Sequence, residues 1–375
     1  GKMTEAGAPA VLIAALSGRA LASCARRSGY RPLVADLFGD LDTRDLAEAN
    51  ERVKGSLALG FTQGALLAAL DRLARGRAVI GLVTGAGFER RPGLLRALAA
   101  RYELLGNSRE TVSAIKDPFR FAALCEAAGV KHPDIRRERP AEGAWLRKLA
   151  GGSGGGHVVA ATRQARPRDG WYYQRRVAGT PVSVAFLAAG GACCVLGLSR
   201  QWVDPAPRQR FRYGGASRPA PVSTVQAATM QAAVARLVAR TELRGLNSAD
   251  FLVTAEDVHL LEVNPRPGAT LDIFALGMAD LFRWHVDACR GVLPDVAPVG
   301  PGGSASAIAY APAPICLRAG FAWPDWAADR QAPDETVPAG APLCSVLAEA
   351  EDAASAERLV RDRTAEILAR AGAVP

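Results

Sequence analysis

Apolar runs separated by polar turns divide the early part of the chain into alternating strands and helices. Strands are predicted over residues 10–15, 32–35 and 78–83, and helices over 20–28 and 92–101. Turns are marked by Ser17-Gly18-Arg19 and Gly85-Ala86-Gly87. This order is typical of a Rossmann-like domain, which we expect to end near Leu105. Because the G-x-G-x-x-G fingerprint is missing, a dinucleotide-dependent dehydrogenase is not favoured.

The middle of the chain predicts further helices and strands around a glycine-rich loop. Residues 106–133 have helical periodicity that stops at Gly129, and residues 222–243 form an alanine-rich helical stretch. In residues 144–159 a strand that carries Lys148 runs into a loop with five glycines. Such a loop lets backbone N–H groups approach phosphate oxygens, although a flexible linker has the same composition. Residues 171–188 predict two strands with a bend near Gly179.

Residues 246–272 predict a hairpin that gathers oxygen ligands. Two apolar runs, 251–253 and 258–263, flank the polar turn at residues 255–257. A turn centred on Glu256 places Asp250 opposite Glu262, and strand alternation puts Asn264 on the same face. Because opposed carboxylates repel each other, a cation should lie between them, and these ligands suit Mg²⁺. The alternative is that both acids face solvent or pair with Arg266.

Composition narrows the functional classes. The 375 residues are 49% hydrophobic and 22% charged, which indicates a soluble protein with substantial cores. The apolar run at residues 8–16 is too short to cross a membrane. Seven scattered cysteines without C-x-x-C spacing argue against a disulfide framework or zinc site, and a cytoplasmic location fits best. The net charge of +9 comes with no nucleic-acid-binding signature, so nucleotide phosphates and an acidic small molecule are the expected partners.

The segment Leu-Glu-Val-Asn-Pro-Arg-Pro-Gly, following an acid at this distance, resembles the metal-binding strand of the ATP-grasp superfamily. The resemblance implies ATP and Mg²⁺, or Mn²⁺ in its place, as cofactors. It implies metal ligands at Asp250, Glu262 and Asn264, and an Arg266 that contacts the reacting carboxylate. Lys148 would reach the α- or β-phosphate. A lysine commonly follows the aspartate of the entering helices in this family, whereas here Pro118 follows Asp117 and Lys116 precedes it.

The same resemblance implies a nucleotide site. Strand residues from Gln174 to Val177 would border the adenine. Leu252 and Leu260 are either adenine-packing residues on the metal-bearing face or ordinary core leucines. His157 could touch phosphate or substrate, or be merely exposed. The expected nucleotide contacts are Lys148, Gly154, Gly155, Gly156, His157, Gln174, Arg175, Val177, Leu252 and Leu260.

The resemblance extends over nearly the whole chain and implies an α/β ATP-grasp fold. We expect a pre-ATP-grasp domain at 1–105, a two-lobed ATP-grasp unit at 106–290 and a small C-terminal lobe at 291–375, similar to that of biotin-carboxylase-like proteins. The branch of predicted ATP-dependent carboligases is similar, as are the tyramine–glutamate ligases of methanofuran-type cofactor biosynthesis.

The implied activity is an ATP-dependent ligation of a carboxylate to an amine through an acyl phosphate, with Lys148 and Arg266 as the catalytic residues. The alternatives are a non-catalytic nucleotide sensor or assembly subunit, and a carboxylase that uses bicarbonate. Small molecules are the expected partners, with neither nucleic acid nor membrane, and a homodimer is one option for the assembly.

A basic stretch at residues 208–218 predicts a loop at the mouth of the site. It carries Arg212 and Arg218, and Arg200 follows a predicted strand. Arginines here could bind a carboxylate of an acidic substrate such as glutamate, because the guanidinium offers a bidentate fork. A solvated basic loop is the alternative.

Overall fold

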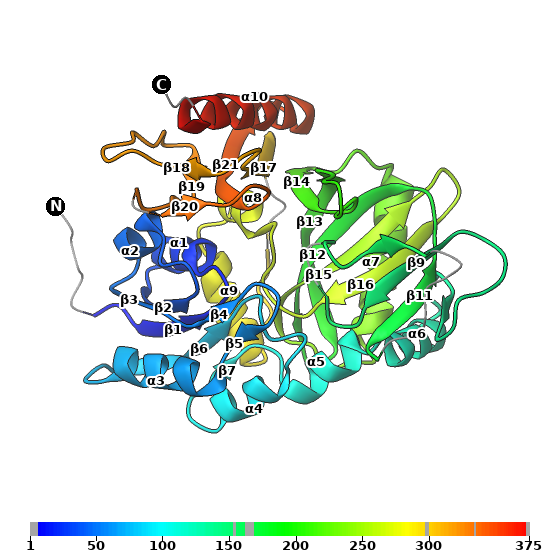
Figure 1. Cartoon of the computed structure of the whole chain (residues 1–375). Coiled ribbons are helices and arrows are strands. Elements are labelled where there is room, and N and C mark those ends of the chain that lie inside the picture. Colours follow the sequence, from blue (N-terminus) through cyan, green and yellow to red (C-terminus); the bar gives the residue numbers. More distant parts are fainter. Residues whose placement is uncertain (1–6, 153–154, 162–168, 297–299, 334, 373–375) are drawn as a thin grey trace.

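A parallel sheet forms the first part of the molecule. The computed structural model describes residues 7–152, 155–161, 169–296, 300–333 and 335–372. The five-stranded sheet has the order β3-β2-β1-β6-β7 (Figure 1). Its strands are β1 (Ala10–Ala14), β2 (Arg31–Asp36), β3 (Ala49–Arg52), β6 (Val79–Thr84) and β7 (Leu104–Leu105), and its helices are α1 (Arg19–Arg27), α2 (Leu41–Leu46), α3 (Gln63–Ala74) and α4 (Gly93–Ala99). All residues of β1 are buried, as expected for a parallel strand covered on both faces. The predicted Rossmann-like opening is confirmed.

Two helices connect this domain to the rest of the chain. They are α5 (Arg109–Lys116) and α6 (Pro118–Ala127). The Asp117 side chain caps α6 by accepting hydrogen bonds from the Phe119 and Arg120 amides, and Pro118 occupies the first helical turn. Proline is favoured there because that turn has no partner for its N–H. Gly129, with φ +64°, follows the end of α6, as the sequence predicted.

Two antiparallel sheets make up the remainder of the molecule. The small sheet consists of β8 (Ile135–Arg136), β9 (Trp145–Leu149), β10 (Val159–Ala160) and β11 (Trp171–Arg175). The large sheet has eight strands in the order β16-β15-β12-β13-β14-β17-β21-β19. They are β12 (Thr180–Ala189), β13 (Ala192–Val203), β14 (Tyr213–Arg218), β15 (Gly245–Val253), β16 (Val258–Asn264), β17 (Gly303–Tyr310), β19 (Ala327–Ala328) and β21 (Pro342–Ala350). The C-terminal strands therefore continue the large sheet. The domain limits at 105 and 290 remain a proposal.

Helices cover both faces of the large sheet. Helix α7 (Thr224–Val238) packs on one face, in a core shared with alternate residues of β12, β15 and β16. Helices α8 (Leu271–Ala275) and α9 (Leu281–Cys289) pack on the other face, while α10 (Ala353–Gly372) covers β17 and β21. Two small antiparallel sheets complete the fold. One pairs β4 (Gly55–Ser56) with β5 (Gly60–Phe61), and the other pairs β18 (Ile315–Cys316) with β20 (Thr336–Val337).

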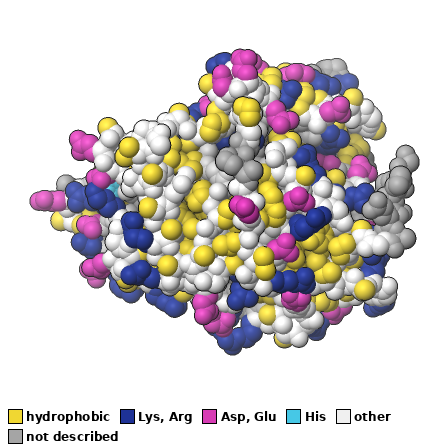
Figure 2. Space-filling view, turned by 180° about the vertical axis from the view of Figure 1, so that it is seen from behind, with side chains coloured by type: hydrophobic (Ala, Val, Ile, Leu, Met, Phe, Trp, Pro, Cys, Tyr) yellow, Lys and Arg dark blue, Asp and Glu magenta, His cyan; other side chains and the backbone are white. Residues whose placement is uncertain are grey.

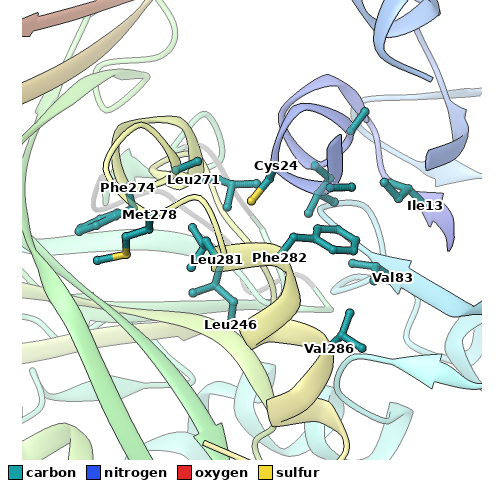
Figure 3. Packing of buried hydrophobic residues seen from close by; sticks show 14 of the residues in the cluster. Ile13, Cys24, Val83, Leu246, Leu271, Phe274, Met278, Leu281, Phe282 and Val286 are labelled. Atoms are coloured by element: carbon teal, nitrogen blue, oxygen red, sulfur yellow. The ribbon is translucent and has the colours of Figure 1, made fainter. Parts of the chain in front are cut away.

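An apolar cluster joins the first domain to the large sheet (Figure 3). Phe282 and Val286 on α9 lie between Leu246 of β15 and Val83 of β6, and Cys24 of α1 belongs to the same cluster. The buried His285 fixes this joint, because its Nδ1 accepts the Leu246 amide at 2.9 Å and its Nε2 lies 2.9 Å from the Leu105 carbonyl. The first domain is thus packed directly against the strand that carries Asp250.

Polar contacts reinforce the same joint. The buried Arg19 of α1 makes a bidentate contact with Asp272 of α8, at 2.7 Å for both bonds, and its Nε donates to Asp329 at 3.0 Å. One arginine therefore links the three predicted parts of the chain.

On the face shown in Figure 2, described basic side chains are interspersed with acidic ones around hydrophobic atoms. Among the described residues, no helix has both the length and the apolar character needed to cross a membrane.

Asp40 next to this joint should make stability depend on pH. Burial and the charges of Asp329, Asp42 and Asp36 raise the pKa of Asp40 to about 8. Since this pKa is raised above its unfolded value, Asp40 favours folding at low pH, and that contribution is lost as the pH rises through the folded pKa. Asp40→Asn should therefore raise the melting temperature at pH 9 and change it little at pH 4. Asp45→Asn, on the exposed side of α2, is the control. An equal effect of Asp40→Asn at both pH values would contradict this assignment.

Candidate active site

The hairpin of β15 and β16 brings the predicted oxygen ligands together. Asp250 pairs directly with Glu262, and Asn264 Nδ2 donates to Asp250 Oδ2 at 3.0 Å. The register therefore agrees with the sequence prediction at the two acids. It shifts immediately beyond them, so that Phe251 pairs with Leu260.

This shift corrects the expected position of Leu260. A bulge places one extra residue in the strand and reverses the faces beyond it. Leu260 is fully buried in the same core as Phe251 and Val263, so it is a core leucine and does not lie on the metal-bearing face. Leu261, the extra residue of the bulge, is half-buried. Leu252 is also half-buried and pairs with His259, and its adenine contact remains a proposal.

Lys116 is the cation that faces these oxygens. Its Nζ lies 3.2 Å from each of Glu262 Oε2, the Val263 carbonyl and Asn264 Oδ1. Lys116 ends α5, directly before the Asp117 cap. The sequence left open whether Lys116 replaces the lysine missing at position 118; the structure places its ammonium group among the candidate metal ligands.

Burial and charge give the two carboxylates different acidities. Burial and the charge of Glu262 raise the pKa of Asp250. Burial by itself also raises the pKa of Glu262, but the charges of Lys116 and Lys148 outweigh burial and lower it. Glu262 is therefore the carboxylate held ionised by lysines, while Asp250 depends on a further cation to keep its charge.

The residues present fit a magnesium ion. Asp250 Oδ1 is buried and has no hydrogen-bond partner among the described residues. Two carboxylates and one amide oxygen are the ligand types that Mg²⁺ takes, with its remaining positions left for water and phosphate oxygens. Among the described residues, no three His, Cys, Asp or Glu side chains gather in one metal-binding group, so a zinc-type site is not formed there.

Lys148 approaches the site from the small sheet. It lies on β9, is 8% exposed, and its Nζ donates to Gln174 Oε1 on β11 at 3.1 Å. Burial lowers the pKa of Lys148, whereas the charge of Glu262 raises it. The buried Gln174 Nε2 has no partner among the described residues, and neither does His132 Nε2.

The glycine-rich loop packs tightly beside Lys148. A side chain on Gly155, with φ +73°, would come within 1.9 Å of the Phe211 carbonyl, and one on Gly152 would meet the His157 ring at 2.4 Å. Glycine is required at both positions. His157 is half-buried and its Nδ1 accepts the Leu149 amide at 3.1 Å, so the ring is anchored to β9. Gly156 is half-buried in the same turn, and Gly154 lies outside the described residues.

The other expected nucleotide contacts lie at the end of β11. The Arg175 amide donates to the Asp134 carbonyl at 2.8 Å, and its side chain is exposed. Val177 is half-buried in the connection to β12. Their nucleotide contacts, like those of the glycine loop, remain proposals.

Lys148→Ala should weaken ATP binding roughly ten- to a hundredfold, because a hydrogen bond to a charged group contributes about 1.5–3 kcal/mol. Calorimetry with a non-hydrolysable ATP analogue and Mg²⁺ measures the change. Lys131→Ala, which removes an exposed lysine paired with Asp257, is the control. Unchanged nucleotide affinity in Lys148→Ala would remove Lys148 from the phosphate site.

Arg266 reaches the first domain. Its Nε donates to Glu89, which follows the Gly85-Ala86-Gly87 turn after β6, and both side chains are largely buried. Burial by itself raises the pKa of Glu89, but the charges of Arg266 and Lys116 lower it to about 2. Glu89 is not among the site residues predicted from the sequence. An acid directly after a glycine turn at the carboxyl end of a parallel strand was the available signal.

Asn107 holds the base of the hairpin. Its Nδ2 donates to Asn247 Oδ1 and to the Pro265 carbonyl, both at 2.8 Å, and its Oδ1 accepts the Arg244 amide at 2.9 Å. These bonds fix the segment between Asn264 and Arg266 against the start of β15. Asn107 is not among the site residues predicted from the sequence.

The arginines expected at the mouth of the site have other positions. Residues 213–218 form strand β14, so only the first part of the basic stretch is a loop. Arg212 pairs with Asp204 at 3.0 Å and lies over the Tyr310 ring. Arg200 lies within β13 and pairs with Glu357 of α10. Each of these two arginines is therefore paired with a carboxylate of the chain, and a contact of either with a substrate remains a proposal. Arg218 is buried on the large sheet.

Comparisons with known proteins agree with this geometry. Residues 115–270 match the model of the ATP-grasp domain. No curated protein matches the sequence. Among solved structures, biotin carboxylase from Campylobacter jejuni, in complex with β,γ-ATP, superposes with a TM-score of 0.72 at 15% identity, over 94% of this chain and 90% of that one. An L-amino acid ligase from Bacillus licheniformis gives 0.68 at 13% identity, over 94% and 96%.

A larger protein contains the same fold as one part. Pyruvate carboxylase from Rhizobium etli gives a TM-score of 0.71 at 16% identity, and the match covers 95% of this chain but 36% of that enzyme. At these identities the likeness concerns the fold. The chain has the mixed α/β ATP-grasp fold, and its residues 115–270 match the model of the ATP-grasp domain.

Proposed function

We propose that the chain is an ATP- and Mg²⁺-dependent ligase that joins a carboxylate to an amine through an acyl phosphate and releases ADP and phosphate. One observation carries this proposal: Asp250, Glu262 and Asn264 lie together, the side chain of Lys116 contacts two of them, and the charge of the buried Lys148 acts on Glu262. A nucleotide's phosphates are bound by a divalent cation, which needs oxygen ligands, and by lysines next to it.

In the first step, a carboxylate oxygen of the substrate attacks the terminal phosphorus of ATP. The bond from that phosphorus to the bridging oxygen breaks, and ADP leaves with the bond's electron pair. Lys148 and Lys116 would hold phosphate oxygens, and Arg266 would orient the carboxylate. Bound at Asp250, Glu262 and Asn264, Mg²⁺ supplies positive charge that stabilises the transferred phosphoryl group.

In the second step, the amine nitrogen attacks the carbonyl carbon of the acyl phosphate. The carbon–oxygen bond to the phosphate breaks, and phosphate leaves with the proton that the nitrogen loses. Arg266, whose guanidinium is held by Glu89, would stabilise the developing oxyanion. An amino acid as one substrate, and a role in cofactor biosynthesis, belong to the same proposal. The likeness to an L-amino acid ligase supports the amino acid.

Two other functions compete with ligation. A non-catalytic nucleotide sensor is supported by Pro118, which stands where the family commonly has a lysine. Lys116 contacts Glu262 and so supplies a lysine at the site, which weakens this support. A carboxylase that uses bicarbonate is supported by the likeness to biotin carboxylase.

A screen of carboxylates and amines for nucleotide products separates these functions. We expect ADP and phosphate to form only when a carboxylate and an amine are both present. ADP release that requires bicarbonate and biotin would support the carboxylase. Nucleotide binding without release of any product across the screen would support the sensor, and release of AMP and pyrophosphate would exclude the acyl-phosphate route.

A further inference from the structure

A row of polar side chains crosses the large sheet and begins at the candidate metal site. Glu262 pairs with Asp250, Asp250 pairs with Ser183, and Ser183 pairs with Ser199 on β13. The pairing of Arg200 with Ser217 brings Ser199 opposite Arg218 on the next strand. Residues directly opposite each other share a face, so the row continues the face that carries the metal ligands.

The apolar cluster under α8 and α9 identifies this face. Leu246, Ala185 and Ala216 all belong to that cluster, and each lies an even number of residues from a member of the row on its own strand. Gly197 lies two residues from Ser199. A side chain at this position would meet the Phe274 ring of α8 at 2.8 Å. Below the row the face is largely apolar and packs against α8 and α9. At the row it becomes polar, although Ser183, Ser199 and Arg218 are buried.

The polar atoms of the row are unusual because they lack partners. Ser183 is 1% exposed and Ser199 is 0% exposed, yet neither hydroxyl has a hydrogen-bond partner among the described residues. The same holds for Asp250 Oδ1 and for the hydroxyl of Tyr213, which packs against the same apolar cluster. Buried polar groups are nearly always hydrogen-bonded in native proteins. The Ser183 hydroxyl lies beside the Asp250 carboxylate, and the Tyr213 hydroxyl lies beside Ser306. Ser199 therefore points most directly to a missing ligand or water.

Arg218 indicates the charge of that ligand. Its side chain is buried, its Nε donates to the Ile273 carbonyl at 2.7 Å, and its guanidinium lies over the Phe274 ring. Within the described part of the chain, Arg218 forms no salt bridge, unlike Arg19 and Arg266. The charge of Glu349 acts on Arg218 from two strands away but forms no salt bridge with it. Burying a cation without a paired anion is costly, so a closer anionic group is expected beside Arg218.

We propose that Arg218, Ser199, Ser183 and Tyr213 bind a second carboxylate of the substrate, one that takes no part in the reaction. This inference rests on the proposed ligase function, which places the reacting carboxylate near Asp250 and Arg266. Neighbouring strands lie ~4.8 Å apart, so Ser199 is two spacings, about 10 Å, from Asp250. The substrate is then a dicarboxylate whose acidic groups are separated by a short carbon chain. This proposal keeps the acidic substrate that the sequence predicts. Its second carboxylate would be bound by Arg218 on strand β14, whereas the sequence predicts a loop there.

An anion could instead be a phosphate of the nucleotide, so the test must separate the two sources. Glutarate serves as the dicarboxylate probe, and pentanoate, with the same chain length and one carboxylate, is its control. Calorimetry measures binding of each probe, in the presence of Mg²⁺ and a non-hydrolysable ATP analogue, and binding of the analogue alone. Neither measurement requires turnover, so a failure of the ligase function is seen separately in the product screen.

Ser199→Ala is the principal variant. Because its hydroxyl has no partner within the protein, its removal should not lower the melting temperature. It should weaken glutarate binding about tenfold and leave pentanoate and the ATP analogue unchanged. Arg218→Met should weaken glutarate binding more strongly, and Arg218→Lys should recover part of the loss. Arg212→Met, whose charge is paired with Asp204, is the matched control and should not affect glutarate.

Three outcomes would overturn the proposal. Wild-type protein that binds glutarate no better than pentanoate has no site for a second carboxylate. If Ser199→Ala binds the ATP analogue more weakly but binds glutarate as the wild type does, the anion beside Arg218 is a phosphate of the nucleotide. A change in melting temperature alone would mean that the row holds buried water. If Arg218→Met does not fold, Ser199→Ala still decides among these outcomes.

Discussion

Glu262→Gln is expected to fold normally and to lose turnover roughly a hundredfold or more, because a metal ion stabilises a transferred phosphoryl group by several kcal/mol. Glutamine keeps the shape of the side chain and removes the charge that faces Asp250 and Lys116. The loss should be largest at limiting Mg²⁺. Steady-state rates across a Mg²⁺ titration, with circular dichroism as the check on folding, measure the effect.

Glu256→Gln is the matched control for this variant. Glu256 lies at the exposed turn of the same hairpin, so its charge should not affect the metal. A direct measurement of Mn²⁺ affinity by electron paramagnetic resonance adds a readout that is independent of turnover. A Glu262→Gln protein with full activity at limiting Mg²⁺ would show that the hairpin does not bind the metal.

Arg266→Met should lower turnover by about 10²–10³, the usual effect of removing an oxyanion donor. It should also destabilise the protein by about 3–5 kcal/mol, since Glu89 would be left buried without its partner. Chemical denaturation and steady-state kinetics separate the two effects. Arg283→Met, which removes an exposed arginine paired with Asp280, is the control.

The double variant Arg266→Met/Glu89→Met distinguishes a catalytic role from a structural one. Replacing both members of a buried ion pair by apolar residues often restores stability. We therefore expect the double variant to recover much of the lost stability without recovering turnover. Recovery of both would mean that the pair only holds the first domain to the hairpin.

Local patterns predicted most of the elements and the centre of the site. The buried run of β1, the cap at Gly129 and the hairpin at residues 246–264 follow from periodicity and turn residues within a few positions of each other. The pairing of Asp250 with Glu262 could also be predicted from the sequence, because a short turn sets the register of the two strands that it joins.

Contacts between distant segments could not be predicted in this way. Lys116 and Glu89 meet the metal-bearing strand from α5 and from the first domain, and no local pattern relates these positions. The bulge that buries Leu260 is a one-residue shift that leaves both apolar runs intact. Arg218 was assigned to a loop because glycines precede it, yet Gly214 and Gly215 lie in β14, where side chains would clash with Trp202.

Isotope transfer from the carboxylate is the most direct test of the proposed reaction. A carboxylate substrate labelled with oxygen-18, incubated with ATP, Mg²⁺ and its amine partner, should transfer one labelled oxygen to the inorganic phosphate, because attack on the terminal phosphorus leaves that oxygen with the phosphate. Mass spectrometry of the phosphate detects this label. Label in AMP, or unlabelled phosphate alongside the ligated product, would contradict an acyl-phosphate ligase.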